Sequence, residues 1–263
     1  MVMTDWNPSL YGTFLDWRTR PSCDLAQRLC DLAPQRIVDL GCGPGNSTAI
    51  CSKLWPAAAI LGVDSSPEMI ASARAAYPDR HWMVADIGEW LCRPIGSETP
   101  IHLIFSCAAL QWVEDHATVF PRLLAKLAPG GVLAAHMPTY DAVPNQTMRE
   151  MASSPRWRRW FPDGHAREWR SHSLEFYYTT LAGRAKRLDL WATDYFQVMP
   201  NVDAIVEWYK STGLRPYLDC ITDAMEREGS LTEYRTRLTP SFPTSERGGV
   251  PFVFRRIFIV AGV

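Results

Sequence analysis

Three aspartates, Asp39, Asp64 and Asp86, follow short apolar runs that have the composition of β-strands. A turn of alternate glycines comes directly after the first acid, with Gly41, Gly43 and Gly45. Glycines permit a sharp turn and let the backbone approach a ligand closely. Carboxylates at successive strand ends can accept hydrogen bonds from hydroxyl or amino groups of a ligand. The pattern therefore predicts a ligand held by acids and bare backbone.

The same turn lacks the features of the common phosphate-binding loops. A P-loop needs Gly-Lys-Ser/Thr, but the first lysine after the turn is Lys53. The dinucleotide fingerprint G-x-G-x-x-G would need glycine at position 46, which is Asn46. Asp64 ends a second strand about one βαβ step later, where a carboxylate can accept hydrogen bonds from both hydroxyls of a ribose. Taken alone, each acid could instead cap the helix that follows it.

Strand and helix patterns alternate through the first half of the chain. Strands are expected at 36–40, 59–63, 81–85, 101–105 and 132–137, and helices at 24–32, 46–54, 67–76, 87–91 and 114–127. Such alternation predicts a parallel, doubly wound α/β sheet. Later segments, 189–199 and 252–260, have the composition of two further strands, and 202–211 and 218–238 that of helices.

The three strand-end acids and the glycine turn resemble those of class I S-adenosylmethionine-dependent methyltransferases. The resemblance implies a mostly parallel seven-stranded sheet with an antiparallel last strand and a helical insertion after strand 5. It also implies that Asp39 lies near the methionine moiety, Asp64 binds the ribose and Asp86 lies by the adenine. The implied cofactor-binding set is Asp39, Gly41, Cys42, Gly43, Gly45, Asp64, Ser65, Ser66, Met69, Asp86, Ile87 and Cys107. S-adenosyl-L-homocysteine would be the product.

Further segments along the chain are similar to those of trans-aconitate 2-methyltransferases. They are Trp6–Tyr11, Asp39–Thr48, Asp64–Pro67, Leu110–Trp112, Met199–Pro200, Thr212–Pro216 and Arg256–Ala261. Two positions depart from that pattern: His102 replaces an acid in the fourth strand, and Cys107 replaces an asparagine. The resemblance implies methylation of a carboxylate of a small polycarboxylic acid to a monomethyl ester.

Carboxylate methylation requires no general base, because a carboxylate is already deprotonated at neutral pH. The rate then depends on holding the acceptor in line with the methyl group, for which Gln111, Trp112 and Tyr11 are the positioning candidates. A polyacid needs cationic forks. The substrate-binding candidates are Arg215, Arg256, Arg18, Tyr217 and His136, the last of which could act as a base if the acceptor is a hydroxyl.

The whole chain is expected to form one methyltransferase domain. Residues 1–32 would be a helical lid, 36–137 the cofactor-binding core, 138–187 a substrate-recognition insertion and 188–263 the rest of the sheet. The insertion contains a basic-aromatic run at 156–161. This interleaving is also used to bind single-stranded nucleic acid. A non-catalytic or RNA-binding module is therefore one alternative, and a methyltransferase acting on a natural-product hydroxyl or an acyl-carrier carboxylate is another.

The composition of the chain limits which partners and which cellular compartment are expected. The 263 residues carry a net charge of -1, so bulk charge suggests neither nucleic acid nor an anionic membrane as partner. Seven cysteines without a C-x-x-C pair favour reduced thiols and a cytoplasmic location. No apolar run of membrane-spanning length or secretion leader is expected, and no metal site. Oligomeric state is left open, with a monomer as the simplest case.

Overall fold

A computed structural model describes residues 15–94, 100–139, 141–161 and 170–263. The chain forms two compact units. The first unit comprises residues 1–138, 170–193 and 256–263, and the second comprises 139–169 and 194–255. The proposed division into lid, core and insertion stays a prediction. Among the described residues, no helix combines the length and apolarity needed to cross a bilayer.

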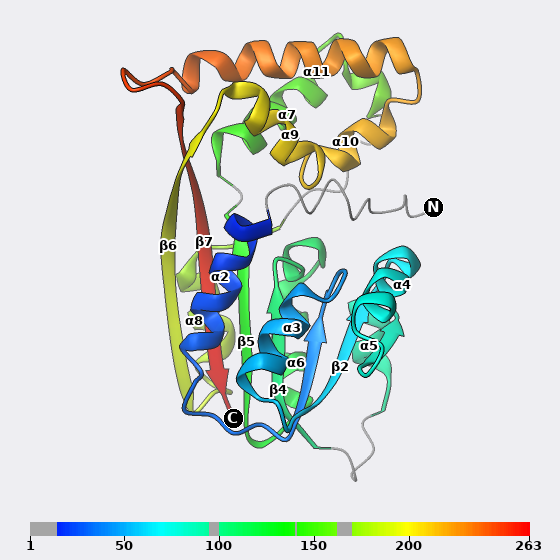
Figure 1. Ribbon diagram of the computed structural model, residues 1–263, viewed down its shortest axis with the longest axis vertical. Coiled ribbons are helices and arrows are strands. Elements are labelled where there is room, and N and C mark those ends of the chain that lie inside the picture. The colour runs from blue at the N-terminus through cyan, green and yellow to red at the C-terminus, as the bar shows by residue number, and fades with distance from the viewer. Residues whose placement is uncertain (1–14, 95–99, 140, 162–169) are drawn as a thin grey trace. The chain divides into compact units, whose positions relative to one another are not determined.

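A seven-stranded sheet has the order β3-β2-β1-β4-β5-β7-β6 (Figure 1). Its strands are β1 (Arg36–Leu40), β2 (Ala59–Asp64), β3 (His81–Val84), β4 (Ile101–Cys107), β5 (Leu127–Pro138), β6 (Arg187–Met199) and β7 (Val250–Gly262). The first five pair in parallel, and β7 pairs antiparallel with β5. The predicted fold class is confirmed.

The strand order reverses between β1 and β4, which are neighbours although β2 and β3 come between them in sequence. In open α/β sheets, this reversal leaves a crevice at the carboxyl ends of the two strands. Four of the five residues of β1 are buried, as expected for a central strand covered on both faces. We therefore expect a ligand-binding site in this crevice.

Helices cover both faces of the sheet in the first unit (Figure 1). They are α2 (Leu15–Gln27), α3 (Asn46–Leu54), α4 (Pro67–Ala76), α5 (Ile87–Cys92), α6 (His116–Ala125) and α8 (Leu174–Leu181). On one face, Trp90 of α5, Phe120 of α6 and Tyr177 of α8 join the strands in a single apolar core. On the other, α2 packs against α3.

The second unit is mainly helical apart from the outer segments of β6 and β7. It contains α7 (Val143–Ser153), α9 (Val202–Lys210), α10 (Arg215–Cys220) and α11 (Ala224–Leu238), with short 3₁₀ turns at Arg158–Trp160 and Thr239–Ser241. The single helix expected at 218–238 is wrong. Asp223 caps a new helix there, because its side chain accepts a hydrogen bond from the Glu226 N–H at 2.9 Å.

The helix expected at 24–32 is also displaced, because α2 begins earlier and ends at Gln27. Leu29 is buried as the apolar spacing predicts, yet its N–H bonds to the Ala26 carbonyl in a turn rather than in a continuing helix. Because α2 begins at Leu15, it includes Arg18 and Ser22, which lie four residues apart on one face of the helix.

Gly41 and Gly43 provide a matched pair of variants for this region. Both have positive φ, +71° and +54°, but a Cβ on Gly41 would lie 2.0 Å from the Ala109 Cβ, whereas one on Gly43 would meet nothing within 4 Å. We expect Gly41→Ala to lower the free energy of unfolding by about 3 kcal/mol or more, and Gly43→Ala by only about 1 kcal/mol, the cost of the left-handed backbone. Urea denaturation measures both, and equal losses would contradict the packing argument.

Candidate functional site

The glycine turn after β1 folds over the end of β2. The N–H groups of Gly41 and Cys42 both donate to the Val63 carbonyl, at 2.8 and 3.1 Å. The Gly43 N–H donates to Oδ2 of Asp64 at 2.9 Å. These bonds require the left-handed backbone of the turn, which is why glycines are needed there. The tips of two neighbouring strands are thereby tied together.

Asp39 is completely buried at the end of β1. Its Oδ2 accepts two short hydrogen bonds, from the Ser47 hydroxyl at 2.7 Å and the Thr48 hydroxyl at 2.6 Å. Its Oδ1 is buried and has no hydrogen-bond partner in the described part of the chain. Burial raises the pKa of Asp39 to about 6 although both hydroxyls lower it. The carboxylate thus has one satisfied oxygen and one that could receive a donor from a ligand.

Asp64 lies at the end of β2 and is partly accessible. Its Oδ1 accepts from the Ser66 N–H at 2.9 Å, while Oδ2 takes the Gly43 N–H. Burial raises the pKa of Asp64, and these backbone donors oppose the shift. Each oxygen keeps a second lone-pair direction, which suits the two hydroxyls of a ribose. Ser66 in turn caps α4 by accepting the Met69 N–H at 3.2 Å.

A pocket of about 440 Å³, partly open to solvent, lies against the glycine turn, and we call it the glycine-turn pocket. It is lined by residues 41–44 and by three groups from other elements. Arg18, Thr19 and Ser22 come from one face of α2, Ser47 from the first turn of α3, and Cys107, Ala108 and His136 from the ends of β4 and β5. All belong to the first unit.

The chain leaves β4 through Ala108, whose φ of +52° is unusual for a residue with a side chain. Its N–H donates to the His136 carbonyl at 2.9 Å, and its carbonyl accepts from Gln111 Nε2 at 2.7 Å. The short 3₁₀ turn η1 (Leu110–Trp112) follows. Strain of this kind is held where the surrounding structure fixes it, often at functional sites. Gln111 Oε1 is buried without a hydrogen-bond partner among the described residues.

His136 is buried on β5, and its Nε2 lies 3.0 Å from the Ser22 hydroxyl. Its Nδ1 has no hydrogen-bond partner in the described residues. Burial, reinforced by the nearby positive charge of Arg256, holds the pKa of His136 well below its ordinary value. Its imidazole is therefore neutral near pH 7, which suits a hydrogen-bonding group better than a proton acceptor with a pKa near the working pH.

Cys107, at the end of β4, faces the same pocket. Burial raises the pKa of its thiol well above the ordinary value, and the charge of Asp39 adds to the shift. The thiol is thus neutral and unsuited to act as a nucleophile. His102, the other departure from the family pattern, lies at the opposite end of β4, where its Nδ1 accepts the Arg36 N–H at 3.3 Å. That departure is remote from the strand tips.

Other predicted residues have different surroundings. Asp86 is exposed and caps α5, accepting the Gly88 N–H at 2.7 Å, so its place beside an adenine stays a prediction. Ile87 begins that helix and is buried.

Arg215 and Tyr217 begin α10 in the second unit, where Arg215 Nε lies 3.9 Å from Asp219 Oδ2. Their grouping with Arg18 and Arg256 of the first unit stays a prediction. Tyr11 lies outside the described residues.

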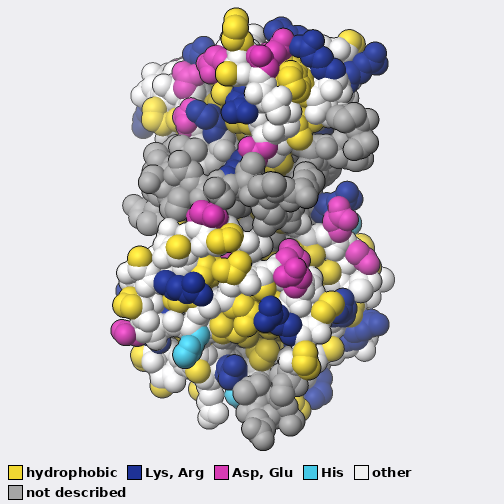
Figure 2. Space-filling model, turned by 90° about the vertical axis from the view of Figure 1, so that its right-hand side faces the viewer, with side chains coloured by type: hydrophobic (Ala, Val, Ile, Leu, Met, Phe, Trp, Pro, Cys, Tyr) yellow, Lys and Arg dark blue, Asp and Glu magenta, His cyan; other side chains and the backbone are white. Residues whose placement is uncertain are grey.

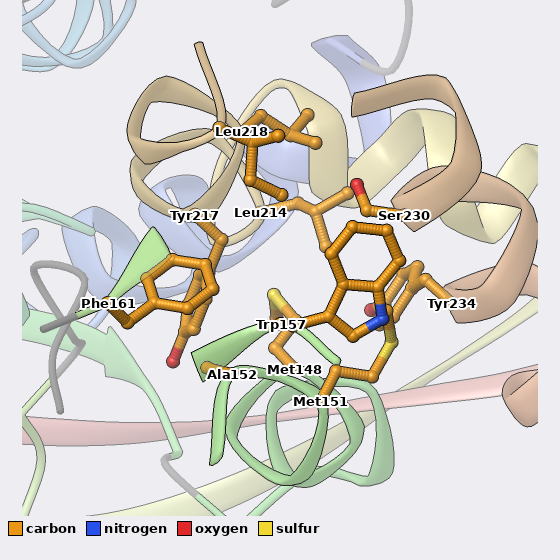
Figure 3. A pocket seen from close by; sticks show the side chains of 11 residues that line it. Met148, Met151, Ala152, Trp157, Phe161, Leu214, Tyr217, Leu218, Ser230 and Tyr234 are labelled. Atoms are coloured by element: carbon orange, nitrogen blue, oxygen red, sulfur yellow. The ribbon is translucent and has the colours of Figure 1, made fainter. Parts of the chain in front are cut away.

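The second unit contains a small apolar cavity, partly open to solvent, with about 330 Å³ of empty space when the open solvent is included (Figure 3). Trp157, Phe161 and Tyr217 contribute rings to its wall, together with Met148, Met151 and Leu214. Two of the polar side chains that line it are bonded to backbone carbonyls. Ser230 donates to the Arg227 carbonyl at 2.7 Å, and Tyr234 to the Pro144 carbonyl at 3.2 Å. A cavity with this lining does not suit a polycarboxylate.

Ser47, Thr48 and Ser22 are residues of the site that the sequence prediction did not include. Ser47 and Thr48 lie within the quoted Asp39–Thr48 motif, and two hydroxyls in the first turn after a glycine loop were the available signal. Ser22 had no signal except its spacing of four from Arg18, which places both on one helix face. In the described part of the chain, no three His, Cys, Asp or Glu side chains gather as a metal site would require.

Comparison with known proteins extends this picture. The chain is 44% identical over 262 residues to a trans-aconitate 2-methyltransferase of Acidovorax ebreus, covering 98% of each sequence. It is 44% identical over 260 residues to one from Escherichia coli and 42% identical to one from Yersinia pestis, again over 98% of each.

Solved structures share the fold at low sequence identity. The YcgJ protein of Bacillus subtilis matches with a TM-score of 0.59 at 15% identity, covering 92% of this chain and 98% of its own. Phosphoethanolamine N-methyltransferase 2 of Haemonchus contortus, solved with S-adenosyl-L-methionine, matches with a TM-score of 0.55 at 16% identity, covering 96% of this chain and 57% of its own. A family model described as a methyltransferase domain matches residues 14–178. The chain therefore belongs to the methyltransferases, within the family of the trans-aconitate 2-methyltransferases.

Proposed function

We propose that this protein transfers a methyl group from S-adenosyl-L-methionine to a carboxylate of trans-aconitate or a closely similar polycarboxylic acid. The single observation that carries the proposal is the buried Asp39 carboxylate, whose Oδ1 has no partner in the described residues, beside the glycine-turn pocket. The full-length similarity to trans-aconitate 2-methyltransferases supports the choice of acceptor.

The residues present fit this cofactor chemically. Asp39 would receive the ammonium group of the methionine moiety on Oδ1, an ionic hydrogen bond that would also relieve the buried charge. Asp64 would accept the ribose hydroxyls. A side chain at Gly43 would project into open space, so the bare backbone leaves room for a ligand there. When bound, the cofactor supplies a methyl group on a sulfonium centre.

An anionic acceptor fits the basic side of the pocket. Arg18 lines it from α2, and Arg256 lies close enough to His136 to depress its pKa. Ser22 adds a hydroxyl and His136 a neutral ring. Carboxylates are best held by such donors, above all by guanidinium groups. Arg215 and Tyr217 belong to the second unit, and they stay substrate-binding candidates only on the family resemblance.

No residue needs to remove a proton in this reaction. The acceptor carboxylate attacks the methyl carbon in its ionised form, an ester bond forms, and the cofactor's thioether departs with the electron pair of the broken bond. The chain's contribution is to hold the reacting groups together and to exclude water. Both His136 and Cys107 are neutral, as expected for a site in which no side chain acts as a base or a nucleophile.

The basic-aromatic run offers little support for a nucleic-acid function. Arg159 pairs with Glu226 at 2.7 Å, and Arg156 approaches Glu233 at 3.5 Å while stacking over Trp157. These cations are thus paired with acids within the second unit. On the face shown in Figure 2, acidic and basic side chains of the described residues are intermixed rather than separated by sign. A small acid is the better partner for this chain.

Methyl transfer itself is the direct test. Incubation with methyl-labelled cofactor and a panel of di- and tricarboxylates should give base-labile label with trans-aconitate, as expected for an ester. Because no residue has to remove a proton from the acceptor, and because Asp39, with its pKa raised to about 6, is mostly ionised above pH 6.5, kcat/KM should vary less than about threefold between pH 6.5 and 8.5. Label on a hydroxyl compound alone, lost in His136→Ala, would favour the alternative acceptor.

Asp64→Ala should weaken cofactor binding by about 30-fold or more, because it removes a charged acceptor for the ribose and the tie to Gly43. Isothermal titration calorimetry with S-adenosyl-L-homocysteine measures the change. Asp79→Ala, which removes an exposed carboxylate before β3, is the matched control and should bind as the wild type does. Unchanged affinity in Asp64→Ala would refute the ribose assignment.

Asp39→Asn should change the pH dependence of stability. Because folding raises the pKa of Asp39 to about 6, stability from the protonated form is present below pH 4 and is lost as the pH rises through 6. Asparagine does not titrate. The variant's free energy of unfolding, relative to the wild type, should therefore rise by about 2 kcal/mol from pH 4 to pH 7.5. Urea denaturation at both pH values tests this, and a pH-independent difference would contradict it.

A further inference from the structure

A second buried histidine lies beside the turn that follows β4. His116 begins α6 and is 1% exposed. Its Nε2 lies 2.9 Å from the Leu110 carbonyl and its Nδ1 lies 2.8 Å from the Tyr177 hydroxyl on α8. The Tyr177 oxygen also accepts the His172 N–H at 3.3 Å. These contacts join the η1 turn to a segment about sixty residues later in the chain.

The hydrogen-bond partners determine the tautomer of His116. A carbonyl oxygen can only accept, so Nε2 must carry the proton that it donates to Leu110. In the neutral ring, Nδ1 is then an acceptor, and the Tyr177 hydroxyl donates to it. The same hydroxyl oxygen remains free to accept the His172 N–H. Every polar group in this chain of bonds is satisfied by the neutral Nε2–H form.

A protonated His116 would fit poorly here. Its Nδ1–H would face the Tyr177 oxygen, which already takes the His172 N–H, and the hydroxyl proton would lose its acceptor. The charged and titratable groups that face His116 are Arg170, His172 and Tyr177. Burial, then the charges of His172 and Arg170, lower the pKa of His116, while the Leu110 and Val113 carbonyls raise it.

The segment 170–177 also makes a direct backbone hydrogen bond to the η1 turn. The Arg170 N–H donates to the Gln111 carbonyl at 2.7 Å. Residues 170–177 thus hold two successive carbonyls of the η1 turn, that of Gln111 directly and that of Leu110 through His116. The side chain of Gln111 is bonded to Ala108 at the rim of the glycine-turn pocket. A shift of the turn would move Gln111 and Trp112 together.

We propose that His116 and Tyr177 are positioning residues for methyl transfer: the neutral His116 ring, held by Tyr177, fixes the Leu110–Trp112 turn so that Gln111 and Trp112 orient the acceptor. This inference rests on the proposed function. Neither residue touches the reacting groups. Their effect is exerted through the backbone of the turn, where a displacement of about 1 Å can cost a large factor in rate.

Two amide variants distinguish the two hydrogen bonds of His116, one to the Leu110 carbonyl and one to the Tyr177 hydroxyl. The amide nitrogen of glutamine can take the place of Nε2, so His116→Gln keeps the bond to Leu110. Asparagine can place its amide oxygen near the position of Nδ1 and accept from the Tyr177 hydroxyl, so His116→Asn keeps only the bond toward Tyr177. We expect His116→Asn to lower kcat by about 30-fold with KM for the cofactor changed less than threefold, and His116→Gln to lose less than about fivefold.

Tyr177→Phe removes one hydroxyl and leaves the ring in the core, and it should lower kcat by about tenfold. Its matched control is Tyr178→Phe on the same helix, where the ring is 61% exposed and activity should be unchanged. All variants are assayed at least about 20 °C below their own melting temperatures, so that a loss of stability does not pass for a loss of positioning. Equal kcat losses in His116→Gln and His116→Asn, or wild-type kcat in Tyr177→Phe, would overturn the proposal.

An independent readout does not depend on turnover. Nitrogen-15 NMR of the histidine rings of the full-length protein should show His116 as the neutral Nε2–H tautomer at pH 7, assigned by its loss in His116→Gln. The Nδ1–H tautomer or a charged ring would refute the inference even if the enzyme is active. If the wild type methylates no polycarboxylate while this tautomer is present, the proposed function has failed rather than the local geometry.

Discussion

A carboxylate buried at the tip of the central strand is the constraint on which the rest of this site depends. Asp39 is fully enclosed, and two hydroxyls satisfy only one of its oxygens. Burying a charge that is only partly hydrogen-bonded is costly, and the raised pKa of Asp39 expresses that cost. A ligand with a cationic donor would complete its coordination. We propose that this carboxylate, at the switch point of the sheet, is the acceptor for the ammonium group of the cofactor.

The neighbouring strand tips are fixed relative to this acid by short-range contacts. The glycine turn is bonded to Val63 and Asp64 at the end of β2, and Gly41 packs against Ala109 after β4. Ala108 bonds to the His136 carbonyl on β5. Four parallel strands therefore present their carboxyl ends in one fixed arrangement. A methyl transfer that needs no proton acceptor depends on such fixed placement more than on any reactive side chain.

Local signals explain which parts of this structure could be predicted from sequence. Helices α3 and α4 begin where expected because a glycine turn and a Ser-Pro cap mark their starts. The single helix expected at 218–238 is wrong because Asp223 caps a new helix, and composition does not distinguish a capping aspartate in a polar segment from a residue on a helix face. Pairs such as Ser22–His136 and His116–Tyr177 join residues 114 and 61 positions apart. Apolar periodicity cannot reveal them, because they arise only when strands and helices have packed.

The central claim is that Asp39 and the glycine turn receive the methionine end of the cofactor. The most direct measurement is a crystal structure of the protein with S-adenosyl-L-homocysteine bound at neutral pH. The account predicts the ligand's amino nitrogen within about 3.2 Å of Asp39 Oδ1 and its sulfur beside residues 41–45. A ligand bound elsewhere, with Asp39 Oδ1 still lacking a partner, would contradict it.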